Sequence, residues 1–377
     1  MNGNKLIGMA VALVLLAGIA VIQKNKFNRS STPAASTRKT LLEGIDLNAV
    51  SGLEVAKGTN SVALAKVDGS WKVKDLSGYP VDFKKLANAI RAMAEVKTGE
   101  PVRTGNVAES EFGFGQDDQR TILLESAGET VATIEVGALR KASDAAGWAN
   151  QYFVRLKGEP EIHLVDYDFR PFSETPEDWI EQQILNVRSS DIVSVKVGDV
   201  ELKLDGADWT LADLDPEKEE FQSSEANKLR SALQYLRCDS IADSSKSDAE
   251  LGFTNAVEYV AQTKDGFTYT ATFGGETNGD RYARFAAAYA KPVAPPAPAD
   301  DANPEDTEAY QKRLDAFNAT CGAHAKKATD LNAKLAGWTY IIRSSESADF
   351  LIGHDKLVKE KAAEEAHTKE PMPQEEL

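Results

Sequence analysis

The chain repeats itself, and this internal repeat constrains its fold more than any other feature. The stretch SEFGF at positions 110–114 returns as AELGF at positions 249–253. Around both stretches the same segments recur in the same order: alternating apolar segments, a tryptophan, an amphipathic segment, the glycine motif and further strand-like segments. An ordered series of matches with a nearly constant offset indicates a duplication. We therefore expect two tandem related domains, at residues 41–183 and 184–353.

Each copy carries one tryptophan on a strand-like segment and one glycine between two large apolar residues. A glycine in this setting suits a turn at positive φ, because it has no Cβ. We interpret the pattern as a structural motif that fills the core. A ligand-contacting loop is the alternative, although neither glycine belongs to a GxGxxG or P-loop pattern. The motif residues are Trp71, Gly113 and Phe114 in the first copy and Trp209, Gly252 and Phe253 in the second.

The order of segments predicts an α+β fold for each copy. Short turns join most of the strand-like segments, so these strands should pair antiparallel, and one amphipathic helix can cover only one face of the sheet. We expect that helix to begin after Asp82 in the first copy and after Ser223 or Ser224 in the second. Its apolar face is formed by Leu86, Ile90 and Met93 in the first copy and by Leu229, Leu233 and Leu236 in the second.

Residues 291–337 have no counterpart in the first copy. They open with a Pro/Ala/Asp-rich run and continue with apolar residues at three- and four-residue steps, which predicts a helix of about 30 residues. A break near Gly322 would instead give two shorter helices. The apolar stripe either packs on its own domain or projects toward a protein partner. The candidate partner stripe is Tyr310, Leu314, Phe317, Leu331 and Leu335.

An uncharged apolar run occupies residues 6–22, after a short tail at residues 1–5. A run of this length is at the short limit for a transmembrane helix, which needs roughly 17–25 residues. We expect an uncleaved anchor, and a cleavable signal peptide is the alternative. A polar linker at residues 23–40 would separate the anchor from the body, and residues 354–377 form a charged C-terminal tail.

The orientation of the anchor is open to two interpretations. Lys24, Lys26 and Arg29 follow the apolar run, and the positive-inside rule would keep a body behind them in the cytoplasm. That rule is weakest for long domains, and an N-terminal anchor with a short leading tail usually accompanies export. We therefore expect a single-pass protein of the cytoplasmic (inner) membrane whose body faces the periplasm.

Charge and composition exclude some functions. The net charge is −16, and the chain up to Arg29 contributes four basic and no acidic side chains, so the rest carries −20. Such a body repels nucleic acid. The four histidines are scattered, and no metal, cofactor or catalytic motif is complete. Cys238 and Cys321 are expected to be separate small apolar side chains, or else one intradomain disulfide.

The anchor, the stretch GSWKV followed by YPVDFKKLANAIRAM, and the FGF/LGF motif resemble the bacterial family called domain of unknown function 4340. This resemblance extends over nearly all of residues 41–353. It implies a membrane-anchored envelope protein found with permease and auxiliary components of gliding-motility-type ABC transporters, and it supplies no catalytic residue. We therefore expect a non-enzymatic scaffold or accessory subunit of an ABC-type transport assembly, with the membrane and a permease or auxiliary subunit as partners.

Two other functions are compatible with the same residues. The first is an envelope module that binds a glycan or peptide in a cleft between the two copies, with Tyr152, Phe153 and Tyr282 as exposed contact residues. The second, less favoured, is a hydrolase whose site is assembled from scattered residues. Fold alone does not choose among these functions.

Overall fold

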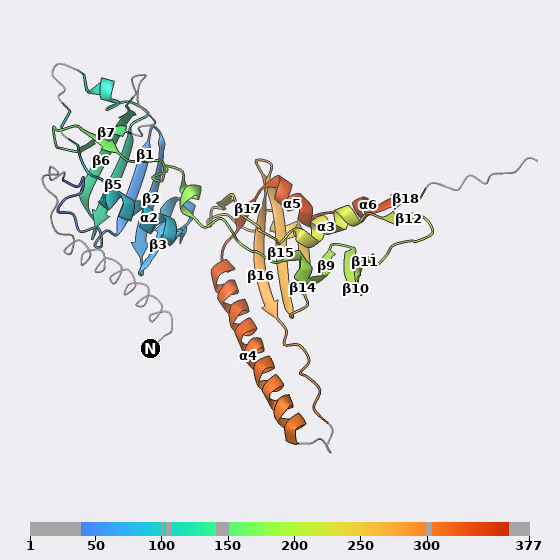
Figure 1. Ribbon diagram of the computed structural model, residues 1–377. Coiled ribbons are helices and arrows are strands. Elements are labelled where there is room, and N and C mark those ends of the chain that lie inside the picture. The colour runs from blue at the N-terminus through green and yellow to red at the C-terminus, as the bar shows by residue number, and fades with distance from the viewer. Residues whose placement is uncertain (1–38, 100, 103–107, 141–150, 299–303, 362–377) are drawn as a thin grey trace, which may run out of the picture. The chain divides into compact units, whose positions relative to one another are not determined.

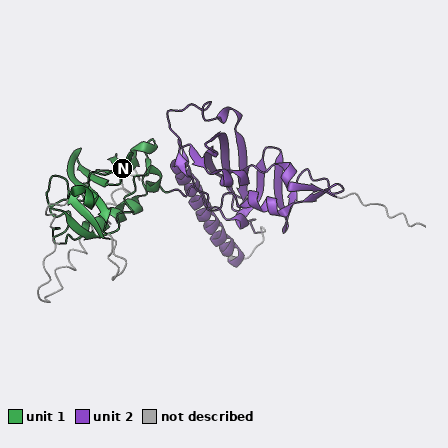
Figure 2. Ribbon diagram, turned by 90° about the horizontal axis from the view of Figure 1, so that it is seen from above, with its two compact units in different colours: residues 1–181 green, residues 182–377 purple. Residues whose placement is uncertain are grey.

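The computed structural model describes residues 39–99, 101–102, 108–140, 151–298 and 304–361 (Figure 1). The chain forms two compact units, Met1–Glu181 and Gln182–Leu377 (Figure 2), and each is considered by itself. The expected anchor at residues 6–22 and nearly all of the linker lie outside the described residues. No helix within the described ranges is both long and apolar enough to cross a membrane.

In its described residues, unit 1 is one antiparallel sheet with a single α-helix on one face (Figure 1). The strand order is β4-β3-β2-β1-β5-β6-β7-β8. The strands are β1 Gly52–Lys57, β2 Asn60–Val67, β3 Ser70–Val73, β4 Tyr79–Pro80, β5 Arg120–Ser126, β6 Glu129–Leu139, β7 Gln151–Leu156 and β8 His163–Asp166. The helix is α2 Phe83–Ala94, and the 3-10 turns are η1 Lys74–Leu76, η2 Glu109–Phe112 and η3 Pro176–Trp179.

The helix α2 forms where the sequence predicts it. The side chain of Asp82 accepts a hydrogen bond from the backbone N–H of Lys85 at 3.0 Å, which satisfies one free amide of the first turn. Leu86 and Met93 are buried against the sheet, and Ile90 is half-buried. Burial of each large apolar side chain contributes about 1.5–3 kcal/mol. The first copy thus confirms both the cap and the apolar face.

Unit 2 has a sheet of the same design, with order β11-β10-β9-β14-β15-β16-β17-β13. Its strands are β9 Ile192–Val197, β10 Val200–Asp205, β11 Asp208–Leu211, β12 Glu219–Phe221, β13 Ser240–Ile241, β14 Val257–Thr263, β15 Phe267–Thr277, β16 Asp280–Tyr289, β17 Tyr340–Ile342 and β18 Val358–Glu360. Its helices are α3 Ser223–Ser231, α4 Pro304–Leu335, α5 Ser344–Phe350 and α6 His354–Leu357, and its 3-10 turns are η4 Ser189–Asp191 and η5 Phe253–Asn255.

The two sheets match strand for strand from β3 to β8 and from β11 to β17. The order β3-β2-β1-β5-β6-β7-β8 becomes β11-β10-β9-β14-β15-β16-β17, and every pair in both series is antiparallel. The sheets are therefore antiparallel and of the predicted α+β type. A shared strand order of this length is what a duplication produces.

Backbone hydrogen bonds fix which residues correspond in the two copies. The amide of Leu41 donates to Val96, and that of Ile184 donates to Leu236 in the same way, at 2.8 and 2.9 Å. These two pairs mark equivalent beginnings of the two copies.

The helix start in the second copy corrects one prediction. The amides of Asp82 and Gln222 make equivalent bonds to Trp179 and Leu357. Gln222 is therefore the N-cap position of α3 and makes no side-chain capping bond, so the predicted cap at Ser223 or Ser224 is wrong. The helix also ends at Ser231, before two of the leucines predicted for its apolar face, Leu233 and Leu236, although both are buried.

Unit 2 departs from the predicted plan of one covering helix. The short helix α5 adds Phe350 to the core, where its ring meets Tyr259 and Phe273. The sequence indicated a charged tail from residue 354, but α6 and β18 lie there, and β18 pairs with β12. The insertion α4 runs without interruption through Gly322, so the alternative of two shorter helices is wrong.

Candidate functional site

The repeated glycine motif adopts the same geometry in both units. Gly113 has φ +80° and Gly252 has φ +73°, the left-handed region that glycine reaches at little cost. Each also lies against the backbone of a neighbouring strand. A Cβ on Gly113 would lie 2.4 Å from the backbone nitrogen of Ala138, and one on Gly252 would lie 2.5 Å from that of Gly275. The motif therefore requires glycine for two separate reasons.

An arginine on the neighbouring strand completes the motif in each copy. The guanidinium of Arg155 lies 4.6 Å from the ring centre of Phe114 and pairs with Glu109 at 2.7 Å. In the second copy Arg284 lies 4.0 Å from the ring centre of Phe253 and pairs with Asp248 at 2.6 Å. We call each set of arginine, phenylalanine and acid a latch, because it joins the glycine turn to the sheet.

The latches lie over two small apolar clusters that are separate from the main core. The first contains Phe112, Phe114 and Ile162, with Phe153 packed against it. The second contains Leu251 and Tyr282. Tyr282 is only 6% exposed, so its expected role as an exposed contact residue is wrong. Phe153 and Tyr152 are half-buried, and they pack edge-on against Phe112 and Phe169, respectively.

A groove of about 510 Å³ lies between α2, the segment before β1, the end of β2 and the start of β3. We call it the Trp71 groove. Its walls combine aliphatic and aromatic side chains, and four charged residues lie among them. The lining residues are Ile45, Asp46, Leu47, Asn48, Val50, Lys66, Trp71, Phe83, Leu86, Ala87, Ile90, Arg91, Ala94 and Glu95. Its size and lining are those of a binding cleft.

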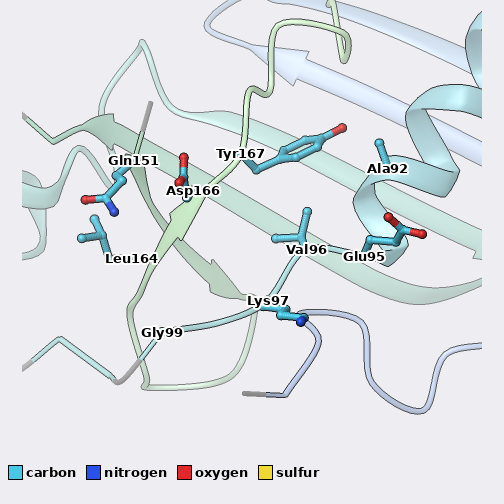
Figure 3. Close-up of a pocket in the computed structure, with 9 residues that line it drawn as sticks. All are labelled: Ala92, Glu95, Val96, Lys97, Gly99, Gln151, Leu164, Asp166 and Tyr167. Carbon is cyan, nitrogen blue, oxygen red and sulfur yellow. The ribbon is translucent and has the colours of Figure 1, made fainter. Parts of the chain in front are cut away.

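A second hollow, of about 650 Å³, lies between the end of α2 and the edge strand β8 (Figure 3). Burial, with a smaller contribution from Asp168, raises the pKa of Tyr167 to about 12, so its hydroxyl stays protonated at neutral pH. The side chains do not converge on one point: Tyr167 is directed toward Ala92, whereas Gln151 lies on the other side of the strand (Figure 3). The residues described around this hollow therefore show no convergent set of polar groups.

The helix α4 divides into two halves. In the second half Cys321, Ala328 and Leu335 are buried, and the ring of His324 packs against Phe267 and Tyr289 with centroids 5.3 and 5.4 Å apart. This half lies beside β16, whereas the first half extends beyond the strands (Figure 1). In the first half Tyr310, Leu314 and Phe317 are only half-buried. Lys291 lies 5.3 Å from the ring centre of Phe317.

The structure separates the candidate partner stripe accordingly. Leu335 is 2% exposed and belongs to the interior of unit 2, and Leu331 is half-buried in the packed half. Tyr310, Leu314 and Phe317 lie on the half that extends beyond the sheet. Their role in binding a partner stays a prediction.

Comparison with protein families matches residues 71–256 to the domain of unknown function DUF4340. This stretch, just under half of the chain, is similar to the DUF4340 family. The DUF4340 match begins at the tryptophan of β3 and ends just after the glycine motif of the second copy, so it crosses from unit 1 into unit 2. The searches of curated proteins and of solved structures give no match.

The DUF4340 match covers all six motif residues but assigns no chemistry to them. Across the described ranges, no group of three or more His, Cys, Asp or Glu side chains is placed to hold a metal ion. Cys238 and Cys321 are both free and buried, so the alternative of a disulfide is wrong. Burial raises the pKa of the Cys238 thiol to about 12, and this thiol donates to the carbonyl of Gln182.

Sequence reasoning missed the two latch arginines, of which Arg284 lies beyond the end of the DUF4340 match. Arg155 and Arg284 are closer together in the sequence than Gly113 and Gly252 are, because the β6–β7 connection is longer in the first copy. The strand register shows that the two arginines are equivalent. Arg155 lies opposite Glu135, and Arg284 lies opposite Thr272. In both copies the residue opposite the arginine is two positions before a glycine of its own strand. An alignment that allowed a gap between these strands could have found the pair.

Proposed function

We propose that this protein is a non-enzymatic, membrane-anchored scaffold that binds a protein partner through the first half of α4. The observation that carries the proposal is the division of α4 into a half that packs on its own sheet and a half that extends beyond it (Figure 1). The helix has 32 residues and is about 48 Å long at 1.5 Å per residue. The packed half fixes the direction in which the other half projects.

The projecting half has the character of a helix that docks into a groove. Tyr310, Leu314 and Phe317 follow one another at helical spacing and keep part of their surface exposed. Exposed charged side chains such as Glu308 and Lys312 occupy other faces, where they form an ion pair. Amphipathic helices of this kind bind partners through residues at i, i+4 and i+7. This helix half extends beyond the sheet and contacts the segment after β16 through Lys291 and Phe317, so a partner would stabilise it further.

The family resemblance and the apolar run at residues 6–22 support a cellular location and an assembly for this scaffold. We propose that the run anchors the protein in the cytoplasmic membrane and that the body lies in the periplasm. In that position the protein would serve as an accessory subunit of an ABC-type transport assembly, with a permease or auxiliary subunit as the partner.

The test is co-purification of the full chain in mild detergent, followed by identification of the bound proteins. We compare the wild type with a Tyr310→Asp/Leu314→Asp variant. The matched control is Gln311→Asp/Ala316→Asp, which adds the same charge to exposed positions of the same half. The proposal predicts that wild type and control recover a permease or its ATPase and that the first variant does not. Equal recovery by all three proteins, or recovery of no membrane component by the wild type, would reject it.

A further inference from the structure

The two copies differ at their shared tryptophan. In unit 2 the guanidinium of Arg230 lies 5.3 Å from the ring centre of Trp209, and Leu204 is the cross-strand neighbour of that ring. Arg230 lies on α3, eight positions after its N-cap Gln222. The residue eight positions after Asp82 on α2 is Ile90, and the cross-strand neighbour of Trp71 is Lys66. Unit 2 thus has a cationic residue on the helix and an aliphatic residue across the strands. Unit 1 has an aliphatic residue on the helix and a cationic residue across the strands.

This exchange leaves the tryptophan of unit 1 without a stacked cation. Of the cations in the described residues, none lies over the ring of Trp71. Ile90 is shorter than arginine and lines the groove instead of crossing it. Phe83, at the start of α2, is 39% exposed, which is unusual for so large an apolar side chain. The groove therefore presents an aromatic floor and an aliphatic wall to solvent.

Unit 2 indicates the shape of a group that fits beside this tryptophan. The guanidinium of Arg230, carried at the end of an aliphatic stem, lies over the ring of Trp209. The volume of the Trp71 groove, about 510 Å³, is within the range of ligand sites. An aliphatic chain with a charged end would take the place that Arg230 occupies in the second copy.

The sign of the charge expected on the ligand follows from the residue across the strands from the tryptophan. Lys66 stands where unit 2 has the neutral Leu204, and its ammonium forms no ion pair with any described residue. Within the part of the chain that the structure describes, Arg91 donates to the neutral amide of Asn88, at 3.3 Å. An anionic end group near Trp71 would therefore meet two cations that the fold leaves available.

Two acids also line the groove and limit this attraction. One carboxylate oxygen of Asp46 already accepts hydrogen bonds from the backbone and side chain of Asn48, at 3.0 and 3.1 Å. Glu95 lies one turn beyond Arg91, at the end of α2. Lys66 is the charged residue paired directly with Trp71 across the strands, so a positive charge is carried beside the aromatic floor.

We propose that the Trp71 groove is a binding site for an aliphatic chain that ends in a carboxylate, a molecule of the fatty-acid type. The chain lies on Trp71 between Phe83 and Ile90, and the carboxylate meets Lys66 and Arg91. This site is in unit 1 and is independent of the partner proposed for α4.

The experiment is calorimetric titration of the full chain, held in lipid nanodiscs, with empty nanodiscs as the blank. The probes are octanoate, octylammonium and octanol, which share one aliphatic chain and differ in end group. We expect one octanoate per chain and at least about tenfold weaker binding of the other two, the scale of one charge-assisted hydrogen bond. Lys66→Gln should weaken octanoate by about tenfold and leave octanol unchanged.

Two reciprocal variants test the comparison between the copies. Ile90→Arg should place a guanidinium on Trp71 and abolish octanoate binding without lowering the melting temperature. Arg230→Ile/Leu204→Lys, combined with Ser223→Phe and Ser231→Arg to supply the counterparts of Phe83 and Arg91, should open an equivalent groove in unit 2 and raise the stoichiometry from one octanoate to two. The second variant keeps the test decisive even where the first fails to fold.

Three outcomes would overturn the proposal. They are no saturable binding of octanoate, equal affinity for octanoate and octylammonium, and wild-type binding by a folded Ile90→Arg variant together with unchanged stoichiometry in the unit 2 variant. If octanoate does not bind and a photoreactive residue at position 90 crosslinks to another protein, the groove binds a protein partner instead.

Discussion

Gly113 and Gly252 combine two requirements that no other residue meets. Both have positive φ, and both lie so close to a neighbouring strand that a single added carbon would collide with backbone atoms. Gly115 separates the two effects, because it has φ +69° but no atom within 4 Å of its Cβ position. Strain alone therefore acts at Gly115, whereas strain and collision act together at the motif glycines.

The first prediction uses this contrast. Gly115→Ala should lower the free energy of unfolding by about 1 kcal/mol, the cost of a left-handed conformation for a residue with a Cβ. Gly113→Ala and Gly252→Ala should each cost clearly more, because the colliding atoms are backbone and cannot rotate away. Urea denaturation of the full chain measures all three. If the Gly113→Ala and Gly115→Ala proteins have the same free energy of unfolding, the close approach to Ala138 does not affect stability.

Single residues also show which parts of the motif the sequence could reveal. The glycine and the following phenylalanine are adjacent in the chain, so their repetition is visible as a short sequence match. The latch arginines come from another strand, and a connection of different length separates them from the glycine. The exchange of Lys66 and Ile90 for Leu204 and Arg230 was likewise invisible, because it depends on which side chains share a tryptophan across strand and helix.

At the scale of elements, α4 is the part that distinguishes the second copy. Its apolar periodicity predicted a helix and its length, and both predictions are confirmed. The periodicity did not show where the helix leaves the sheet, because the same spacing continues through both halves. That boundary depends on the ends of β15 and β16. In the packed half, Asn332 bonds to the backbone of Ala287 on β16.

The second prediction compares the two halves with one substitution. Ala328 is 6% exposed in the packed half, and Ala316 is exposed in the projecting half. Ala328→Asp should destabilise unit 2 by about 3 kcal/mol or more, the scale of an uncompensated buried charge. Ala316→Asp carries the same loss of helix propensity, which is below about 1 kcal/mol. Thermal melting measures both variants. Equal melting temperatures would mean that the second half of α4 is not packed on the sheet.

At the scale of the whole molecule, the chain combines two units of one topology with an apolar N-terminal run. The duplication could be inferred from the sequence because its elements recur in order, and the strand orders agree with it. The packing of α5, α6 and β18 could not, because these short segments have no strong periodicity and are held by contacts with distant residues such as Tyr259.

The third prediction concerns the orientation of the body. A protease added to spheroplasts should digest the chain beyond about residue 40, because a body behind an exported anchor lies outside the cytoplasmic membrane. Cytosolic marker proteins should survive the same treatment. Full protection of the body in intact spheroplasts, with digestion after lysis, would show that Lys24, Lys26 and Arg29 keep it in the cytoplasm.

The central claim is that the projecting half of α4 contacts a partner in the membrane assembly. Site-specific photo-crosslinking in living cells tests it most directly, with a photoreactive amino acid at Leu314 and, as the matched control, at the exposed position Lys312 on another face of the same half. Mass spectrometry then identifies each adduct. The account predicts an adduct with a membrane transport component from position 314 and none from position 312. No adduct from position 314, or the same adducts from both positions, would contradict it.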